Sequence, residues 1–599
     1  MVGLELPVSP LSHHYLVTEN IPEIDELDFE VPMMVDPDGF TYMRQDQKGM
    51  LIGIYEINHE HWMMDGAPWE YGESELLPDA IDRIEDELAL TFNRYPVMER
   101  TGIKTWVNGA FTFSPDGNPL VGPVRGLKNY WLACGVMAGF LQGGGVGKTL
   151  AEWMIYGETE ADQFSMDIAR YGAFASNKEY IKQTTGQFYS RRFVMTYPNE
   201  QLPAGRPLKK TAVYDAQDAA GAQWGVSWGL EVPLMFGPEG FKETPTMKRS
   251  NAFEHVAAEH KAVREAVGMI DITAFSRYEF SGPDAEAFLD WIMASKLPKP
   301  GRAKLAPMVG QDGLLKGDLT VFNWGDGTWW VMGSYYLREW HMRWFDDRQE
   351  EKGFDATVRD ISDTIGGMAI TGPNARKLLE RVTPEDVSND AMKFAQCRVM
   401  DIGMLRAHVG RLSVMGELGY EINVPANQQI ELRNALMKAG EDPSFGEPLG
   451  LREVGYYTMN TTRLEKSFGI WNAEFVQRFS PAETGMDRWI DWSKDFYGKE
   501  EAQKEQATGP SKKIVTLKVD ADHSDAIGYE PVWSGDQMIG HTTSGGYGHT
   551  VGHSLAMAMI DVKYAEPGTK LKTHVVGLEC DCEVIAPSPY DPKGEKLRG

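Results

Sequence analysis

An internal repeat constrains the fold of this chain more than any other sequence feature. Phe280-Ser-Gly-Pro-Asp-Ala-Glu-Ala-Phe-Leu returns ninety residues later as Ile370-Thr-Gly-Pro-Asn-Ala-Arg-Lys-Leu-Leu. Each copy predicts a strand end, a Ser/Thr-Gly-Pro turn and a helix with proline in its first turn. Two copies of one strand–turn–helix unit predict a pseudo-symmetric domain with a functional site where the two halves meet.

The rest of the chain divides around this repeat. The chain has 599 residues, and at about 150 residues per domain roughly four domains are expected. Residues 1–171 mix strand and helix patterns, whereas 172–230 lacks a clear period and is predicted to be a connector. The repeat falls within 231–505, and 512–599 carries short strand patterns between glycine turns, typical of a small β-barrel. The predicted fold class is therefore α+β and multidomain.

Charge and composition exclude several classes of partner. The chain has 87 acidic against 59 basic residues, a net charge of −28. A surface this negative repels phosphate backbones and anionic lipid, so neither nucleic acid nor membrane is a predicted partner. Cys580 and Cys582 form a lone C-x-C with no second ligand pair at metal-binding spacing, so they are interpreted as alternating strand residues and no metal site is predicted.

The same features predict a reducing compartment. Four cysteines are too few for a disulfide framework in a chain of this length. The start, Met1-Val-Gly-Leu-Glu, lacks the pattern of a secretory signal. The longest apolar stretch, 130–141, falls short of the ~20 residues that span a bilayer. We expect a cytoplasmic location, or the mitochondrial matrix if the source is eukaryotic.

A glycine-rich run, Gly143-Gly144-Gly145-Val-Gly-Lys-Thr, is expected to form the turn between a buried strand and a helix over 150–156. It lacks the first glycine of a Walker A loop, because Gln142 stands there, and Lys148 replaces the last glycine of G-x-G-x-x-G. Bare backbone N–H groups at a helix start can approach an anion or a flat cofactor closely. A tight strand-to-helix turn explains the run equally well.

Motifs along the whole chain resemble one family. Three of them, in order, resemble motifs of the aminomethyltransferase (glycine-cleavage T-protein) fold: Gly313-Leu-Leu-Lys-Gly-Asp-Leu-Thr-Val, Gly416-Glu-Leu-Gly-Tyr-Glu-Ile and Thr462-Arg-Leu-Glu-Lys. Two resemble its C-terminal barrel: Thr543-Ser-Gly-Gly-Tyr-Gly-His and Glu566-Pro-Gly-Thr. Three upstream segments resemble the second half of a flavin amine oxidoreductase domain: Leu11-Ser-His-His-Tyr-Leu-Val-Thr-Glu, Phe113-Ser-Pro-Asp-Gly-Asn-Pro-Leu and 143–153. This order resembles the dimethylglycine/sarcosine dehydrogenase family.

The sequence departs from that family at its start. The flavin half of the family opens with a strand and G-x-G-x-x-G, which place the dinucleotide phosphates on a helix N-terminus; about two hundred residues that include it are not found in this sequence. We therefore expect the chain alone to purify with little FAD. Either the sequence is a fragment or starts late in its gene, or a separate flavin-nucleotide-binding chain supplies that half; an electron acceptor is a further possible partner.

The resemblance implies candidate residues for amine oxidation. His13 and Tyr42 match a His and a Tyr that lie beside the flavin, where a histidine exchanges a proton near neutral pH and a phenol contacts the amine. Gly143, Gly144 and Gly145 match the segment that approaches the flavin. The alternatives are that His13 caps a turn and that Tyr42 belongs to the core.

It also implies candidate residues for folate. Asp318 matches the carboxylate near the reactive folate nitrogens, where it would stabilise positive charge on the one-carbon unit. Glu421 matches the acid that pairs with the pterin ring, and Arg463 an arginine that pairs with a carboxylate or a ring heteroatom. A turn residue is the alternative for Asp318, and a salt bridge with Glu465 or another acid is the alternative for Arg463.

The implied function is tetrahydrofolate-linked oxidative demethylation of an N-methyl amine of the dimethylglycine or sarcosine type. The cofactors would be FAD and tetrahydrofolate, and the product 5,10-methylene-tetrahydrofolate. Two alternatives stay open. One is a flavin-free, folate-dependent methyl- or aminomethyltransferase, and the other is a non-catalytic folate-binding subunit of a multi-chain oxidase.

Overall fold

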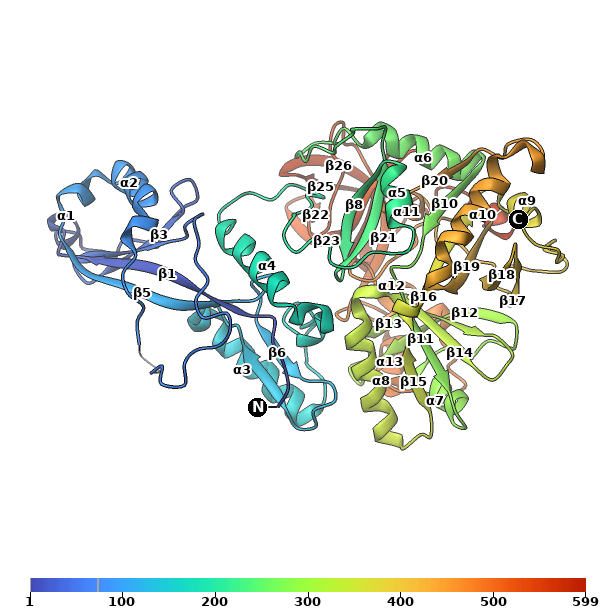
Figure 1. Cartoon of the computed structure of the whole chain (residues 1–599), viewed down its shortest axis with the longest axis horizontal. Coiled ribbons are helices and arrows are strands. Elements are labelled where there is room, and N and C mark those ends of the chain that lie inside the picture. The colour runs from blue at the N-terminus through green and yellow to red at the C-terminus, as the bar shows by residue number, and fades with distance from the viewer. Residues whose placement is uncertain (1, 73–74) are drawn as a thin grey trace. The chain divides into compact units, whose positions relative to one another are not determined.

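The computed structural model describes residues 2–72 and 75–599, which form two compact units (Figure 1). Unit 1 consists of Met1–Thr159, Gln163–Thr196 and Leu202–Leu208, and unit 2 of Glu160–Asp162, Tyr197–Gln201 and Lys209–Gly599. The segment 172–230, predicted to be a connector, contributes to both units. Its boundaries as a separate domain stay a prediction.

Unit 1 is built on a five-stranded antiparallel sheet with the strand order β2-β3-β4-β1-β5. The strands are β1 (Ser9–Thr18), β2 (Met34–Asp36), β3 (Thr41–Asp46), β4 (Gly49–Ile54) and β5 (Ile103–Phe113). One face buries apolar side chains against helix α2 (Glu85–Arg94), including Leu16, Met43, Ile52 and Leu88. Because strand side chains alternate between faces, His13 and Tyr42 lie on the opposite face.

After the sheet come the hairpin β6 (Leu120–Pro123)–β7 (Trp131–Cys134) and helix α3 (Gly139–Tyr156). The prediction that Gly143, Gly144 and Gly145 form a turn before the helix is wrong, since all three lie inside α3. The helix begins earlier because Val146 and Trp153 on one of its faces pack against Val121. That packing outweighs the low helix propensity of glycine.

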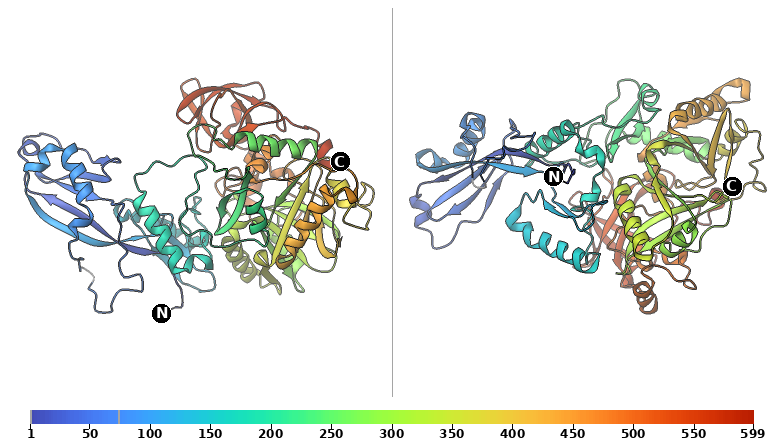
Figure 2. Two further views of the ribbon diagram at one scale, coloured as in Figure 1. Left: turned by 45° about the horizontal axis from the view of Figure 1, so that its top comes forward. Right: turned by 60° about the horizontal axis from the view of Figure 1, so that its bottom comes forward.

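Unit 2 contains the repeat, and its two halves form two sheets, which confirms the predicted pseudo-symmetry (Figures 1 and 2). The first sheet has the order β12-β13-β14-β11-β15 and the second β17-β18-β19-β16-β10-β20. The strands of the first are β11 (Phe275–Ser281), β12 (Arg302–Val309), β13 (Leu315–Asn323), β14 (Trp329–Ser334) and β15 (Thr357–Asp360). Those of the second are β10 (Val267–Asp271), β16 (Ile365–Thr371), β17 (Cys397–Ile402), β18 (Leu405–Gly410), β19 (Gly419–Pro425) and β20 (Leu451–Glu453).

Each repeat copy runs from a strand end through a glycine into a helix: β11 into α7 (Ala285–Ile292) and β16 into α9 (Ala375–Glu380). The glycines, Gly282 and Gly372, adopt φ of +105° and +134°, which side chains with a Cβ rarely tolerate. The prolines precede the helix N-caps Asp284 and Asn374, so the prediction that they occupy the first helical turn is wrong by two residues.

Each sheet is covered by helices on one face and meets the other sheet with its opposite face. Helix α8 (Arg338–Lys352) packs on the first sheet, where the Tyr278 hydroxyl of β11 lies 3.0 Å from His341 Nδ1 of the helix. Helices α9 and α10 (Gln429–Glu441) bury the core face of the second sheet. Between the sheets, the buried Arg277 of β11 donates to Asn423 Oδ1 of β19 at 2.8 and 2.9 Å.

Helices α6 and α11 and a barrel also belong to unit 2. Helix α6 is Phe253–Glu265, and the Asn251 side chain just before it accepts from Thr244 N. Helix α11 is Tyr456–Leu464. The predicted C-terminal barrel is a closed six-stranded barrel, red in Figure 2. Its strands are β21 (Lys512–Val519), β22 (Pro531–Ser534), β23 (Gln537–Gly548), β24 (His553–Asp561), β25 (Lys570–Val575) and β26 (Leu578–Ile585).

Cys580 and Cys582 lie on β26 as predicted, and both thiols are free. Within residues 2–72 and 75–599, no three His, Cys, Asp or Glu side chains group as ligands for a metal ion. Over the same residues, no helix has the length and apolar character needed to cross a membrane.

Candidate active sites

In unit 1 the structure brings His13 and Tyr42 together. The Tyr42 hydroxyl lies 3.1 Å from His13 Nε2, and the Tyr189 hydroxyl lies 2.9 Å from His13 Nδ1. The rings of Tyr55 and Phe111 surround the imidazole at centroid distances of 4.8 and 5.0 Å. The result is a histidine with both ring nitrogens engaged by phenols and with its faces against aromatic rings. Sequence reasoning missed Tyr189, because it lies 176 residues from His13 on helix α4 (Lys178–Ser190).

Gly53 makes the His13–Tyr42 contact possible. It is the cross-strand partner of Tyr42, and a Cβ placed on it would lie 1.9 Å from Tyr42 Cζ. The phenol ring therefore lies directly across the bare backbone of β4 on its way to the imidazole. A glycine inside a strand often marks such a close approach, but sequence reasoning missed Gly53.

We expect Gly53→Ala to lower kcat/KM for amine oxidation by the flavin-loaded enzyme about a hundredfold, because a displacement of about 1 Å at a reacting group costs that much. If Gly53 acts only through Tyr42, the double variant Gly53→Ala/Tyr42→Phe should be no slower than Tyr42→Phe alone. Additive losses in the double variant would contradict this assignment.

Burial sets the protonation states of the pair. Burial, with a smaller contribution from His14, lowers the pKa of His13 to about 3. Burial also raises the pKa of Tyr42 above its ordinary value. At neutral pH the imidazole is therefore uncharged and the phenol protonated. A neutral imidazole behind a phenol can accept a proton from an ammonium group that reaches the phenol oxygen.

The residues around this pair fit a flat cofactor. Gly109 of β5 is the cross-strand partner of His13, and a Cβ placed on it would meet no atom within 4 Å. Open space therefore adjoins the imidazole on this face of the sheet. On α3, Gly143, Gly144 and Gly145 are exposed and also meet nothing within 4 Å, so their backbone can be approached closely. Their predicted role towards flavin stays a prediction.

In unit 2 the structure places Asp318 on β13 and Glu421 on β19, each on the face of its sheet that is turned away from the covering helices. Gly317 faces His341 of α8, so Asp318, the next residue along the strand, points the other way. Tyr420 and Ile422 pack in the core with α9 and α10, so Glu421 between them points away from these helices. Asp318 thus lies within a strand, and the alternative that it is a turn residue is wrong.

Both carboxylates are half-buried, and neither has a hydrogen bond to the side chain of another described residue. Burial raises the pKa of Asp318 to about 7, with the Glu474 charge adding to the shift. Burial likewise raises the pKa of Glu421 to about 7, and the Arg277 charge opposes it. Two half-buried carboxylates whose oxygens have no side-chain partner can accept from N–H donors or pair with a cationic group.

Arg463 forms a salt bridge with an acid, which was the alternative to a contact with folate. It is buried, forms an ion pair with Glu474 at 3.1 Å and donates to Asn460 Oδ1 at 2.7 Å. Glu474 also accepts from the Thr543 and Ser544 hydroxyls of β23, each at 2.6 Å. Arg463 therefore joins α11 to the barrel strand through Glu474, which was missed in the sequence because it lies outside any periodic segment.

The raised pKa values of Asp318 and Glu421 predict how the stability of the folded state depends on pH. A carboxyl group whose pKa rises from about 4 unfolded to about 7 folded binds more protons in the folded state, so stability falls as pH rises through this window. Between pH 5 and 8 we expect Asp318 and Glu421 together to lower the free energy of unfolding by about 5 kcal/mol, or roughly 6 °C in the Tm of unit 2. Asp318→Asn/Glu421→Gln should remove that part of the decline, as measured by calorimetry. The same pH slope in parent and double variant would contradict the prediction.

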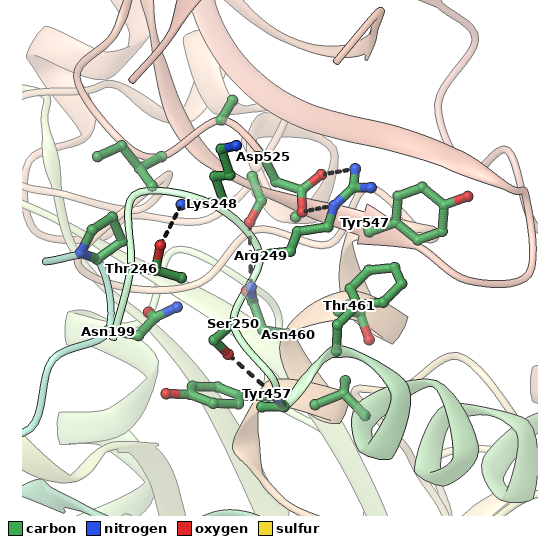
Figure 3. A pocket seen from close by; sticks show the side chains of 18 of the residues that line it. Asn199, Thr246, Lys248, Arg249, Ser250, Tyr457, Asn460, Thr461, Asp525 and Tyr547 are labelled. Atoms are coloured by element: carbon green, nitrogen blue, oxygen red, sulfur yellow. Dashed lines mark hydrogen bonds and ion pairs between the residues drawn. The ribbon is translucent and has the colours of Figure 1, made fainter. Parts of the chain in front are cut away.

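A cavity of about 200 Å³ lies elsewhere in unit 2, between the start of α6, helix α11 and the barrel (Figure 3). Arg249 extends between Asp525 and Tyr547 (Figure 3), with guanidinium–carboxylate distances of 2.7 and 2.8 Å and the Tyr547 ring centroid 4.4 Å away. Asp525 therefore neutralises the guanidinium of Arg249 where the helices meet the barrel.

Four consecutive segments match known domain families. Residues 1–153 match the FAD dependent oxidoreductase family, and 156–211 its central domain. Residues 213–494 match the GCVT N-terminal domain, and 512–591 the glycine cleavage T-protein C-terminal barrel domain. Their order agrees with the order expected from the sequence motifs.

Proteins with this domain order match almost the whole chain. Over 594 residues the chain is 32% identical to dimethylglycine dehydrogenase, mitochondrial, of Mus musculus, which covers 98% of this chain and 67% of the relative. It is 26% identical to sarcosine dehydrogenase, mitochondrial, of Mus musculus, covering 100% of this chain and 69% of the relative. A crystal structure of glycine cleavage system aminomethyltransferase T from Bartonella henselae has a similar fold, with a TM-score of 0.55 and 20% identity over 64% of this chain and 98% of that chain. The chain belongs to the family of dimethylglycine and sarcosine dehydrogenases, which join an FAD dependent oxidoreductase domain to a T-protein-like domain.

Proposed function

We propose that this protein oxidises an N-methyl amino acid of the dimethylglycine or sarcosine type and transfers the released one-carbon unit to tetrahydrofolate. The product is 5,10-methylene-tetrahydrofolate. The observation that carries the proposal is that one chain holds a neutral His13–Tyr42 pair beside open space and, in its other unit, two recessed carboxylates without side-chain partners. The first suits an amine and a flat cofactor, and the second suits a folate.

FAD supplies the acceptor for the hydride equivalent when it is bound. The chain's own residues prepare the amine. Tyr42 contacts the substrate nitrogen, and His13 behind it holds the hydrogen bond that orients the phenol. Because burial keeps His13 uncharged, the pair favours the neutral amine, the form that has an electron pair to release. The rings of Tyr55 and Phe111 exclude water from this side.

In unit 2, Glu421 binds the pterin ring, since two carboxylate oxygens complement two adjacent N–H donors. Asp318 stabilises positive charge that develops on the one-carbon unit during transfer. Arg463 supports the site indirectly: its ion pair with Glu474 fixes α11 against the barrel. A direct contact between Arg463 and folate, as the family motif suggests, would require that ion pair to open.

We expect Glu421→Gln to weaken binding of a reduced folate to the full chain by about 1.5–3 kcal/mol, the contribution of a hydrogen bond to a charged group. Titration calorimetry measures the change. Glu431→Gln, an exposed carboxylate on α10 of the same unit, is the matched control and should bind as tightly as the parent. Equal affinities of parent and Glu421→Gln would place the pterin elsewhere.

The whole reaction is tested with the flavin-loaded chain, an N-methyl amino acid and an electron acceptor, with and without tetrahydrofolate. Formaldehyde without folate and methylene-tetrahydrofolate with folate are the expected products. Folate-dependent transfer without flavin would favour a transferase. Binding of folate without any turnover would favour a non-catalytic subunit. The electron acceptor, a separate flavin-nucleotide chain and a location in the cytoplasm or the mitochondrial matrix remain parts of this proposal; the two mouse relatives carry the word mitochondrial in their names.

A further inference from the structure

A chain of hydrogen bonds leads from His13 away from the open face into unit 1. The Tyr189 hydroxyl lies 2.9 Å from His13 Nδ1 and donates to Glu56 Oε2 at 2.6 Å. Glu56 Oε1 accepts from Arg83 at 2.8 Å. The side chains of Tyr189 and Glu56 are fully buried.

The order of donors and acceptors in this series of hydrogen bonds determines which ring nitrogen of His13 carries the proton. Glu56 forms an ion pair with Arg83 at 2.8 Å, and a carboxylate can only accept, so the single Tyr189 proton is directed to Glu56 Oε2. The Tyr189 oxygen must then accept from His13, which places the imidazole proton on Nδ1. A neutral imidazole with Nδ1–H has its lone pair on Nε2, where the Tyr42 hydroxyl donates at 3.1 Å.

Because the Tyr42 hydroxyl donates its proton to His13 Nε2, the lone pairs of the Tyr42 oxygen remain available to the substrate. We propose that Glu56, acting through Tyr189, holds His13 as the Nδ1–H tautomer and stabilises the imidazolium that forms when His13 and Tyr42 take a proton from the substrate ammonium. Both are positioning residues, since neither touches the substrate. The proposal rests on the proposed amine oxidation, and its first test is independent of it.

The proton step is balanced. The substrate ammonium N–H bond breaks and its proton passes to the Tyr42 oxygen, while the Tyr42 proton passes to His13 Nε2. The ammonium becomes a neutral amine and the imidazole becomes an imidazolium, so the positive charge stays in the same cavity and no electrons move. Burial disfavours a charged His13 when no substrate is bound, and it likewise disfavours a charged ammonium group in the same place. Once the proton reaches His13, the Glu56 carboxylate attracts the positive charge of the imidazolium.

Other charged groups nearby do not replace Glu56. Burial raises the pKa of Glu56, while the hydrogen bond from Tyr189 and the charge of Arg83 oppose the rise. Besides Glu56, the titratable and charged groups that face this cluster are Tyr42, Tyr55, His14, His59, Arg83 and Arg192. All of these are neutral or cationic. Glu60 is a second acid that pairs with Arg83, at 3.4 Å, but of the two only Glu56 bonds to Tyr189, so Glu56 supplies the negative charge that stabilises an imidazolium here.

The tautomer is measured by ¹⁵N spectra of the chain labelled at histidine, without flavin or substrate. The His13 signals are assigned as those missing from His13→Gln. We expect a protonated Nδ1 and an unprotonated Nε2 in the parent. Tyr189→Phe, which removes one oxygen, should give a mixture of tautomers. Tyr55→Phe is the matched control, because its ring also contacts His13 but its hydroxyl does not bond to it, and it should keep the parent tautomer.

A protonated Nε2 in the parent, or an unchanged spectrum of Tyr189→Phe, would overturn the proposal. Either result would leave the proposed function standing, because the measurement needs no turnover. Conversely, a parent that shows Nδ1–H but never oxidises an N-methyl amine would sink the proposed function and with it the role of the imidazolium.

The second test is the pH profile of kcat/KM for the flavin-loaded variants. Tyr189→Phe and Glu56→Gln should lose about thirtyfold near pH 7, a modest part of the effect of general base catalysis. The loss should shrink towards pH 10, where the amine arrives already neutral and no proton has to be taken up. A merely structural role lowers the rate equally at every pH, so a loss independent of pH would overturn the proposal. If Glu56→Gln fails to fold because Arg83 loses its partner, Tyr189→Phe still decides.

Discussion

Replacement of His13 by glutamine is expected to abolish almost all amine oxidation, with a fall in kcat/KM of about a thousandfold at pH 7. Glutamine is near in size and keeps one donor and one acceptor, but it cannot take up a proton. The Tyr42 hydroxyl, 3.1 Å from His13 Nε2 in the parent, would still contact the substrate but would have no base behind it. The loss measures the contribution of the base rather than of the hydrogen bond alone.

Two controls separate this effect from misfolding. Folate affinity of His13→Gln should equal that of the parent, since the candidate folate residues belong to unit 2. His523→Gln makes the same chemical change at an exposed site in unit 2 and should leave oxidation unchanged. The loss in His13→Gln should diminish towards pH 10, where the free amine is supplied by the solution. Activity within threefold of the parent at pH 7 would remove His13 from the mechanism.

Local sequence patterns were sufficient to predict the pseudo-symmetric domain and the barrel. The Ser/Thr-Gly-Pro repeat predicted two related halves, because Gly282 and Gly372 must adopt positive φ at the same point of each copy. The family motifs also indicated Asp318 and Glu421 as candidate folate residues, but Asp318 was expected in a turn and lies within β13. The two halves and the barrel are features that a few consecutive residues determine.

Features that depend on distant residues were missed. Tyr189 and Glu56 meet across 133 residues, and no local pattern links a tyrosine on a helix to a glutamate that follows a strand. The partner of Arg463 was open between Glu465 and another acid, and it is Glu474, whereas Glu465 pairs with Arg264 at 2.9 Å. The start of α3 was misplaced for a similar reason, since helix formation at Gly143 depends on packing against Val121.

Asp318→Asn is expected to separate amine oxidation from one-carbon transfer. The side chain lies on the inner face of the first sheet, on a strand held on both sides by β12 and β14, so its position is rigid before substrate binds. A rigid carboxylate that stabilises charge only during transfer contributes to the transition state and little to folate binding. We therefore expect folate affinity to remain nearly unchanged.

Formation of methylene-tetrahydrofolate should fall about a hundredfold in Asp318→Asn, or ~2.7 kcal/mol, the usual loss of one preorganised electrostatic partner. Amine oxidation by the flavin-loaded variant should continue, with formaldehyde released instead of captured.

Because burial raises the pKa of Asp318 to about 7, capture of the one-carbon unit by the parent should also decline below pH 7 as this carboxylate takes up a proton. The variant should show no such decline. The partition between formaldehyde and methylene-tetrahydrofolate measures both effects, with Asp536→Asn, an exposed turn residue of the barrel, as the matched control. Equal partition in the parent and Asp318→Asn would leave Asp318 a structural residue of β13.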